Sequence, residues 1–306
     1  MRTAAHSSVQ APVDIRMDIH ANIHSHKGTA SSTSRQAMDC IALEVPVALV
    51  FNGISHAVMM ASPADLADFA LGFSLTEGIV QHPDELYDIE VVEKSAGIAV
   101  QVQISAQRLA QLQQYRRNLT GRTGCGLCGA ESLAQAIRPV TQVAAPPIGD
   151  AAIQRALAEL PQHQPLQRET GASHGAAWCD LDGRIRLARE DVGRHNALDK
   201  LIGALVRSRE DLRQGFALVS SRASYEMVQK SCNIGIGALV AVSAPTSLAI
   251  DLARDAGLML VGFARPGRHV IYHPGGTSRQ SGTSRQSGTS DQSDTSHQDN
   301  PARTAG

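Results

Sequence analysis

Cys125 and Cys128 are the residues whose type and spacing most directly suggest chemistry. Their two thiols stand three positions apart in the segment Thr123-Gly124-Cys125-Gly126-Leu127-Cys128-Gly129. Three glycines disfavour both helix and strand, so a loop that can carry sulfur atoms to different places is predicted. A short helix is predicted over residues 130–137, which would put Cys128 near a helix N-terminus. The free backbone N–H groups of that end, together with Arg122, favour a thiolate over a thiol.

The Cys-x-x-Cys spacing is compatible with three kinds of site. A structural zinc site needs four ligands, and the sequence has no second Cys-x-x-Cys pair. A dithiol redox centre is the second possibility, and a persulfide carrier, which holds sulfur on one thiolate and hands it on, is the third. The spacing leaves all three open. The remaining cysteines, Cys40, Cys179 and Cys232, are scattered and are interpreted as packing residues or incidental thiols.

Composition excludes several classes of protein. The chain has 306 residues, of which 42% are hydrophobic, so it can bury a sizeable core. A net charge of −1 and an aromatic content of 3% argue against a dedicated nucleic-acid binder. There is no run of about eighteen apolar residues, so no membrane span is expected. The polar N-terminus has no apolar segment of the kind found in secretory signals, so none is expected either. Five cysteines, an odd number, suit a reducing compartment, and a cytoplasmic location is expected.

Four segments are predicted along the chain. Residues 1–39 are rich in Ser, Ala, His and Thr and are expected to be disordered. Residues 40–115 are expected to form a small α+β module, and residues 116–275 an α/β domain that carries the Cys-x-x-Cys loop. Within residues 276–306 a polar six-residue unit repeats from Gly276, and its copies contain no apolar side chain, which predicts a disordered tail.

The small module is predicted as β-β-α-β-β. Two strands, 43–51 and 56–60, flank the hairpin signal Asn52-Gly53. Ser62 is predicted to cap the following helix, and two further strands complete the module at 87–93 and 97–104.

The larger domain is predicted to contain a parallel-rich sheet covered on both faces. Short, fully apolar strands alternate there with helices, as in such sheets. A polar helix or a linker at 107–118 leads to the cysteine loop, and Asp150 can cap a helix to residue 160. The other predicted elements are a hairpin (175–180 and 184–188), three strands (216–219, 238–242 and 258–261) and helices over 196–206, around 226–228 and over 246–256.

The carboxyl ends of the three apolar strands carry hydroxyls, glycines and arginines. They are followed by residues 220–224, 243–247 and 262–268. Ligands of open α/β sheets bind at such ends, and this chemistry suits a phosphate or diphosphate. Arg222, Ser243 and Thr246 are therefore candidate contacts, although each hydroxyl could equally be an ordinary helix cap. His195, inside the dense polar run 189–200, is a further candidate, and His174 is a weaker one.

Several of these segments resemble those of a known family. They are Thr-Gly-Cys-Gly-Leu-Cys-Gly at 123–129, Arg-Glu-Asp-Val-Gly-Arg-His-Asn-Ala-Leu-Asp-Lys at 189–200, Ser-Arg-Ala-Ser-Tyr-Glu-Met-Val-Gln-Lys at 221–230, Val-Ser-Ala-Pro-Thr-Ser at 242–247 and Gly-Phe-Ala-Arg at 262–265. The chain is similar to the formate dehydrogenase accessory sulfurtransferases, the FdhD family, over about residues 42–273. The two polar ends lie outside the resemblance.

The resemblance implies a function that spacing alone does not. Proteins of this family take sulfur as a persulfide from a cysteine desulfurase and pass it to the molybdenum cofactor of formate dehydrogenase, the Mo-bis(molybdopterin guanine dinucleotide). By this resemblance Cys125 would carry the persulfide and Cys128 would be a second relay or resolving thiol. The family's cofactor contacts would fall on Phe263, Ala264, Arg265, Pro266, Gly267 and Arg268. A cytidine-deaminase-like three-layer core is implied, a homodimer would suit the family, and no metal of its own is expected.

Two other functions are possible alternatives. A zinc-dependent deaminase needs His-x-Glu followed by Pro-Cys-x-x-Cys. Here Gly175 and Ala176 follow His174, and Thr123-Gly124 precede Cys125, so the acid and the proline are missing. A chaperone that holds the molybdenum cofactor without transferring sulfur is the other alternative, and it predicts that a Cys125→Ala variant keeps full function.

Overall fold

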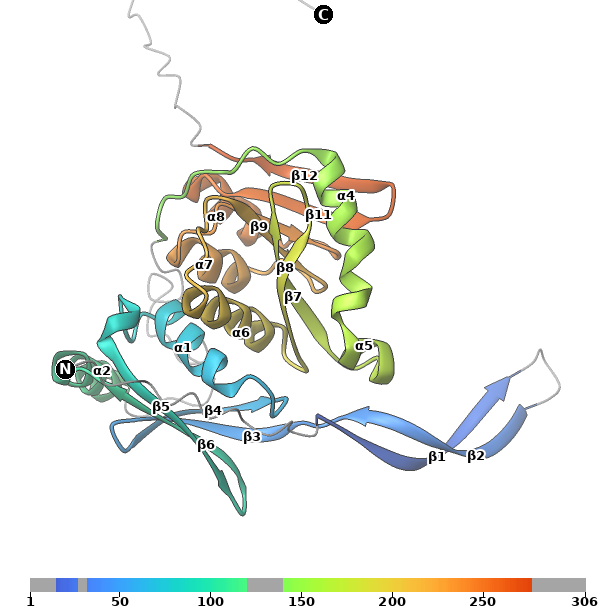
Figure 1. Ribbon diagram of the computed structural model, residues 1–306, viewed down its shortest axis with the longest axis horizontal. Coiled ribbons are helices and arrows are strands. Elements are labelled where there is room, and N and C mark those ends of the chain that lie inside the picture. Colours follow the sequence, from blue (N-terminus) through green and yellow to red (C-terminus); the bar gives the residue numbers. More distant parts are fainter. Residues whose placement is uncertain (1–14, 27–31, 120–139, 277–306) are drawn as a thin grey trace, which may run out of the picture.

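The computed structural model describes residues 15–26, 32–119 and 140–276. The Cys-x-x-Cys segment and the hexapeptide repeat therefore lie outside the described residues. The described chain contains a two-stranded, a four-stranded and a six-stranded sheet. Figure 1 shows the four-stranded sheet below the six-stranded one, with helices α1 and α6 between them.

The four-stranded sheet belongs to an N-terminal module that matches the predicted β-β-α-β-β order. Its strands are β3 (Val45–Phe51), β4 (Ile54–Ala61), β5 (Leu86–Lys94) and β6 (Gly97–Ile104), in the order β4-β3-β6-β5. A short 3-10 helix, η2 (Pro83–Glu85), precedes β5. Asn52 and Gly53 both have positive φ, as the predicted tight hairpin requires. Helices α1 (Leu66–Thr76) and α2 (Ala106–Leu119) complete the module, and both pack on the core of this sheet.

The prediction of disorder up to residue 39 is wrong for part of that segment. Strands β1 (Arg16–His26) and β2 (Ser32–Ala42) pair antiparallel as a ribbon that extends away from the body of the molecule (Figure 1). Met17, Ile19 and Ala21 alternate with polar residues, and this period of two indicates a strand despite the polar composition. Pairing satisfies the backbone groups of both strands without a core, and Arg16 forms an ion pair with Glu169.

The six-stranded sheet forms the core domain. Its strands are β7 (His174–Asp180), β8 (Ile185–Asp191), β9 (Gly215–Val219), β10 (Ala238–Ala241), β11 (Met259–Arg265) and β12 (Arg268–Pro274), in the order β12-β11-β10-β9-β7-β8. The central strands β9, β10 and β11 are parallel, as predicted. The flanking strands β7, β8 and β12 join them antiparallel, so the sheet is mixed rather than mostly parallel.

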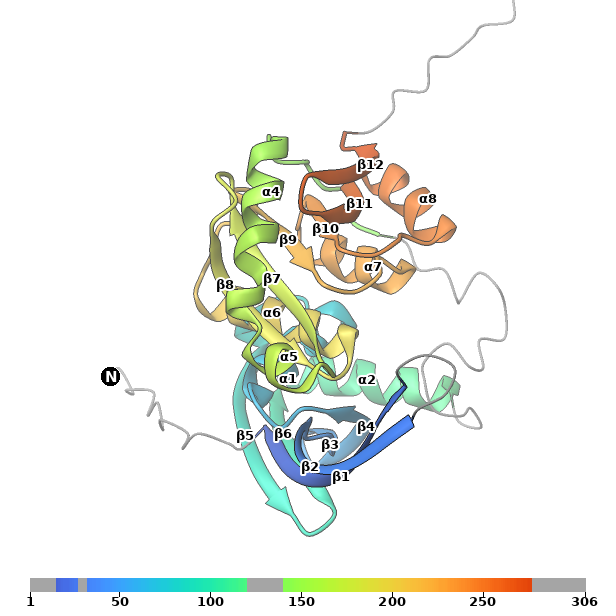
Figure 2. The same cartoon turned by 90° about the vertical axis from the view of Figure 1, so that its right-hand side faces the viewer.

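Helices cover both faces of this sheet. Helix α4 (Asp150–Glu159), followed by η3 (Leu160–His163) and α5 (Pro165–Thr170), lies on one side. Helices α6 (Arg194–Arg207), α7 (Tyr225–Asn233) and α8 (Ser247–Ala256) lie on the other (Figure 2). Within β9, Phe216 and Leu218 pack in the α4 layer, whereas Ala217 and Val219 pack against the α6–α8 layer. The predicted α/β class and three-layer core are confirmed, and the likeness to cytidine deaminases stays a prediction.

Three predicted boundaries are wrong for local reasons. Ser62 does not cap α1, which begins at Leu66 after Asp65 in a left-handed conformation. Instead, the Ser62 N–H donates to Asp191 Oδ2 at 3.0 Å and its hydroxyl accepts from the Val192 N–H at 3.2 Å. Gly149, not Asp150, is the N-cap of α4. Strand β11 continues past residue 261 through two irregularities in its pairing with β12, a strand that was not predicted.

Helices α1 and α6 join the module to the core domain with their backbones in contact. A Cβ atom added to Gly72 would lie 2.7 Å from the carbonyl carbon of Asp199 and closer still to its oxygen. One added to Gly203 would lie 2.6 Å from the carbonyl carbon of Asp68. Normal carbon–carbon contacts are about 3.5–4.0 Å, so this crossing requires glycine at both positions.

Ionic contacts to buried carboxylates hold both ends of the α1–α6 crossing. Asp68 accepts from Arg189 Nη2 and from Arg207 Nη1, each at 2.8 Å. At the other end of α1, Thr76 Oγ1 donates to Asp199 Oδ1 at 2.8 Å, and Lys230 Nζ lies 3.0 Å from Asp199 Oδ2. The module is thereby fixed to the helix that carries His195.

A third buried pair lies between β8 and α6. Lys200 Nζ is 2.6 Å from Asp191 Oδ2, and both side chains are fully buried. The same ammonium donates to the Ser62 carbonyl at 2.9 Å, so Ser62 contacts Asp191 through its N–H and Lys200 through its carbonyl. Charges this deep are stable only when paired, because an isolated one would lose its hydration without compensation.

Candidate functional site

A cavity of about 490 Å³ lies at the carboxyl edge of the parallel strands. Ser220 follows β9, Val242 follows β10, and Ala264 and Arg265 end β11. His174 lies at the same edge because β7 runs antiparallel to β9 and begins where β9 ends. Open α/β sheets bind ligands at this edge, and the size is within the usual range for a small-molecule site, about 300–1,000 Å³.

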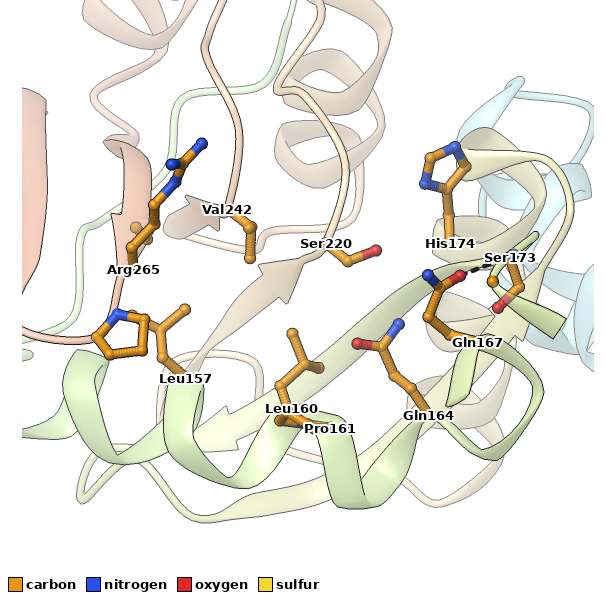
Figure 3. Close-up of a pocket in the computed structure, with 13 residues that line it drawn as sticks. Leu157, Leu160, Pro161, Gln164, Gln167, Ser173, His174, Ser220, Val242 and Arg265 are labelled. Atoms are coloured by element: carbon orange, nitrogen blue, oxygen red, sulfur yellow. Dashed lines mark hydrogen bonds between the residues drawn. The ribbon is translucent and has the colours of Figure 1, made fainter. Parts of the chain in front are cut away.

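The opposite wall comes from α4, η3 and α5. Leu157 and Leu160 are buried members of the apolar cluster between α4 and the sheet, and they extend it to the cavity. Figure 3 shows Arg265 at one end of the cavity and Gln164, Gln167, Ser173 and His174 at the other. The cavity thus has an apolar middle, a guanidinium at one end and neutral polar groups at the other.

Most groups at the polar end are already hydrogen-bonded. The Gly175 N–H donates to Ser220 Oγ at 2.9 Å, and the Ser173 N–H donates to Gln167 Oε1 at 2.9 Å. Ser173 Oγ donates to Glu190 Oε1 at 2.7 Å. Burial, with the Arg194 charge as a second cause, lowers the pKa of His174, so its imidazole is neutral at neutral pH.

The predicted segment 263–268 contributes to this cavity only in part. Ala264, Arg265 and Pro266 line it. The Phe263 N–H donates to the Ser243 carbonyl at 3.0 Å, and the Gly267 N–H donates to Gln154 Oε1 at 2.7 Å. Arg268 begins β12 and is paired with Arg265 across the turn, and it does not line the cavity.

The strand-end residues Arg222, Ser243 and Thr246 are near this edge, but they do not line the cavity. Arg222 is exposed in the connection from β9 to α7. Thr246 is the N-cap of α8, with its hydroxyl accepting from the Ala249 N–H at 3.4 Å. Its hydroxyl therefore has the ordinary capping role that the sequence left open.

His195 lies at the start of α6, beside the start of α7. Its Nε2 is 3.4 Å from Glu226 Oε2, which accepts from Ser224 Oγ at 2.9 Å. Burial is the main cause that lowers the pKa of His195, and Arg194 lowers it further against the opposing effect of Glu226. The imidazole is therefore neutral at neutral pH and is available to donate or accept one proton.

Most of the polar run 189–200 serves the fold. Besides Arg189, Asp191, Asp199 and Lys200, which form the buried ionic contacts, Asn196 Nδ2 donates to the Met60 carbonyl at 2.9 Å. Five members thus hold the N-terminal module or its contact with α6. Glu190 accepts from the Leu166 and Gln167 N–H groups of α5, each at 2.8 Å, whereas Arg194 and His195 lie at the start of α6 and do not line the cavity.

Two cysteines are unsuited to sulfur chemistry. Cys179 and Cys232 are completely buried. Burial raises the pKa of the Cys232 thiol to about 12, and that of Cys179 is raised more strongly by burial and by Asp180. Their interpretation as packing residues is confirmed, since such thiols do not form thiolates at neutral pH. Cys40 lies half-buried on β2, and Cys125 and Cys128 lie outside the described residues.

The α4–α5 wall was missed in the sequence because Leu157 and Leu160 follow the spacing of an ordinary amphipathic helix. Gln164 and Gln167 carry no motif. The sequence could have indicated these two residues only through the predicted helix before them, if that helix had been expected to pack beside the strand ends.

Comparison with known proteins gives a consistent picture. The model of the FdhD/NarQ family matches residues 42–278. The sulfur carrier protein FdhD of Cupriavidus necator is 57% identical over 242 residues, which cover 77% of this chain and 83% of that protein. The protein of the same name from Xanthomonas campestris pv. campestris is 53% identical over 255 residues, covering 82% and 89%.

A solved structure shares the fold. The crystal structure of a proposed formate dehydrogenase accessory protein from Desulfotalea psychrophila superposes with a TM-score of 0.63 at 23% identity. The match covers 85% of this chain and 97% of that one.

Proposed function

Because this chain belongs to the FdhD/NarQ family, we propose that it is a sulfur carrier in the maturation of formate dehydrogenase. It accepts sulfur from a cysteine desulfurase and transfers it to the Mo-bis(molybdopterin guanine dinucleotide) that the dehydrogenase needs. The relatives from two organisms that carry the name sulfur carrier protein support this role. The cavity at the carboxyl edge of β9, β10 and β11 is the structural observation that carries the proposal for the cargo.

The sulfur is held on Cys125, with Cys128 as a second thiol. In the loading step the Cys125 thiolate attacks the outer sulfur of the donor persulfide. A new S–S bond forms on Cys125, the donor S–S bond breaks, and the donor cysteine leaves as a thiolate. Cys179 and Cys232 are excluded from this step because burial keeps both thiols protonated.

One guanine nucleotide arm of the cargo occupies the cavity. Arg265 offers a guanidinium, which pairs well with phosphate oxygens, at one end. Leu157, Leu160 and Val242 offer an apolar surface for a flat ring in the middle. A space of about 490 Å³ suits one nucleotide and not the whole bis-dinucleotide, so the remainder of the cargo extends outside.

The decisive experiment is intact-mass analysis after incubation with a cysteine desulfurase and cysteine. The wild type is expected to gain one sulfur atom that a thiol reductant removes, and Cys125→Ala is expected to gain none. Cys40→Ala, which removes the half-buried cysteine of β2, is the matched control and should load like the wild type.

The same variants separate this proposal from a cofactor chaperone without sulfur transfer. If Cys125→Ala activates formate dehydrogenase as well as the wild type does, the chaperone is correct and the sulfur relay is wrong. A wild-type protein that gains no sulfur and instead holds stoichiometric zinc would likewise refute the relay.

The remaining expectations concern partners and location. We propose that the protein contacts the desulfurase and formate dehydrogenase directly, in the cytoplasm. We also propose a homodimer, since symmetric dimers are the commonest oligomers. Analytical ultracentrifugation tests the dimer. Within residues 15–26, 32–119 and 140–276, no helix is both long and apolar enough to cross a membrane.

A further inference from the structure

Gln164 has a buried polar atom without a partner at the polar end of the cavity. The residue is 6% exposed, and no described residue forms a hydrogen bond with its Nε2. Figure 3 shows the amide directed from the α5 side toward the cavity interior and Ser220. Buried amides are rarely left unpaired in folded proteins, so this one requires an explanation.

The surroundings of Gln164 hold the amide in this position. Its N–H donates to the Pro161 carbonyl, and its carbonyl accepts from the Arg168 N–H at 3.0 Å, which fixes the backbone between η3 and α5. The side chain lies over Gly175, where an added Cβ would come within 2.7 Å of Gln164 Cδ and closer still to Nε2. Glycine at 175 therefore leaves the space that the amide occupies.

Two polar atoms near Gln164 already accept hydrogen bonds within the described structure. Gln167 Oε1 accepts from Ser173, and Ser220 Oγ accepts from Gly175. Among the residues that line the cavity, Gln164 therefore has a buried side-chain nitrogen, Nε2, that forms no hydrogen bond with any described residue.

We propose that Gln164 is a specificity-determining residue that hydrogen-bonds the polar edge of the heterocycle bound in this cavity. The inference rests on the proposed function, in which that heterocycle is a guanine. An amide offers a donor and an acceptor side by side, which matches the adjacent O6 acceptor and N1–H donor of guanine. The ring then lies on Leu157 and Leu160, and the phosphates lie toward Arg265, at the opposite end of the cavity.

Calorimetry on the full chain tests this with two probes. GDP carries the polar edge, whereas the 5′-diphosphate of unsubstituted purine riboside has the same ring, ribose and phosphates without it. The wild type is expected to bind GDP about 10- to 100-fold more tightly than the purine analogue, as for a matched pair of hydrogen bonds. In Gln164→Leu, which keeps the volume and removes the amide, this ratio should fall to about 3-fold or less.

Gln162→Leu is the matched control because Gln162 lies on η3, two residues away, and is exposed. It should keep the wild-type ratio. A Gln164→Leu variant with the wild-type ratio would overturn the inference and leave the proposed function standing. If the wild type itself fails to bind GDP, the nucleotide site of the proposed function is wrong and the inference falls with it.

Thermal unfolding without nucleotide adds an independent readout. If the amide serves the ligand, Gln164→Leu should melt at or above the wild-type temperature, because an unpaired buried amide has been replaced by an apolar group. A melting temperature below that of Gln162→Leu would mean that the amide serves the fold, and it would overturn the inference.

Discussion

The close crossing of α1 and α6 predicts that Gly72→Ala destabilises the whole protein. The new Cβ would lie 2.7 Å from the carbonyl carbon of Asp199 and 3.0 Å from the backbone nitrogen of Gly203, so the helices must separate by about 1 Å. Overpacking of this kind costs about 1–3 kcal/mol. Separation also lengthens the 2.8 Å bond from Thr76 to Asp199 and those near it, and breaking a buried ionic contact costs about 3–5 kcal/mol.

The substitution has one favourable effect, since alanine is better than glycine inside a helix by about 1 kcal/mol. The net loss in the free energy of unfolding is therefore about 3–7 kcal/mol. At about 2–4 °C per kcal/mol, the Tm should fall by about 6–28 °C.

Thermal unfolding followed by circular dichroism measures this effect. Gly149→Ala is the control, because nothing lies within 4 Å of a Cβ at that position and only a helix-capping loss of about 1 kcal/mol is expected. A Tm for Gly72→Ala within about 2 °C of the wild type would refute the reasoning, because it would show that the two backbones are not in contact.

Three further predictions follow from the site and its titratable groups. Arg265→Ala should weaken GDP binding in calorimetry about 10-fold or more, whereas Arg268→Ala, which removes an arginine outside the cavity lining, should not. Equal losses of affinity in the two variants would contradict the placement of the phosphates at the Arg265 end of the cavity. Cys179 and Cys232 should resist iodoacetamide at about pH 8 in the native protein and react after unfolding, as measured by peptide mass analysis, because burial raises the pKa of both thiols. Because the pKa of His195 is lowered from 6.5 in the folded protein, the unfolded chain takes up its proton first, and stability should fall as the pH drops below about 6.5. The urea midpoint should therefore change less between about pH 7.5 and about pH 5.5 in His195→Gln than in the wild type, and an equal change in both would contradict this cause.

The sequence predicted the elements with strong local signals. The Asn52-Gly53 hairpin, the hairpin of 175–180 and 184–188, the apolar strands β9 and β10 and the amphipathic helix α6 are present close to their expected positions. The ribbon of β1 and β2 was missed because its polar composition masked an alternation of two residues. Strand β12 was missed because residues 262–268 were interpreted only as the end of a strand, and no element was predicted after them.

The site was predicted less completely. Strand ends were expected to bind phosphate, and Arg265 does lie at the cavity, but Arg222 and Thr246 do not line it. A hydroxyl that caps a helix and one that binds a ligand look alike in a sequence, because both follow a strand and precede a helix. Only the position of the facing helix decides between them.

The sequence by itself determined the chemistry available and the family, because Cys125, Cys128 and the motifs around them are local in the chain. Tertiary structure alone decided how the run 189–200 is used. Three of its residues are buried and contact residues more than a hundred positions away in the sequence: Asp191, Asp199 and Lys200. A polar run that looks exposed in the sequence therefore attaches the N-terminal module to the core domain. Burial and long-range pairing depend on which helices meet, and no local pattern of charges encodes that.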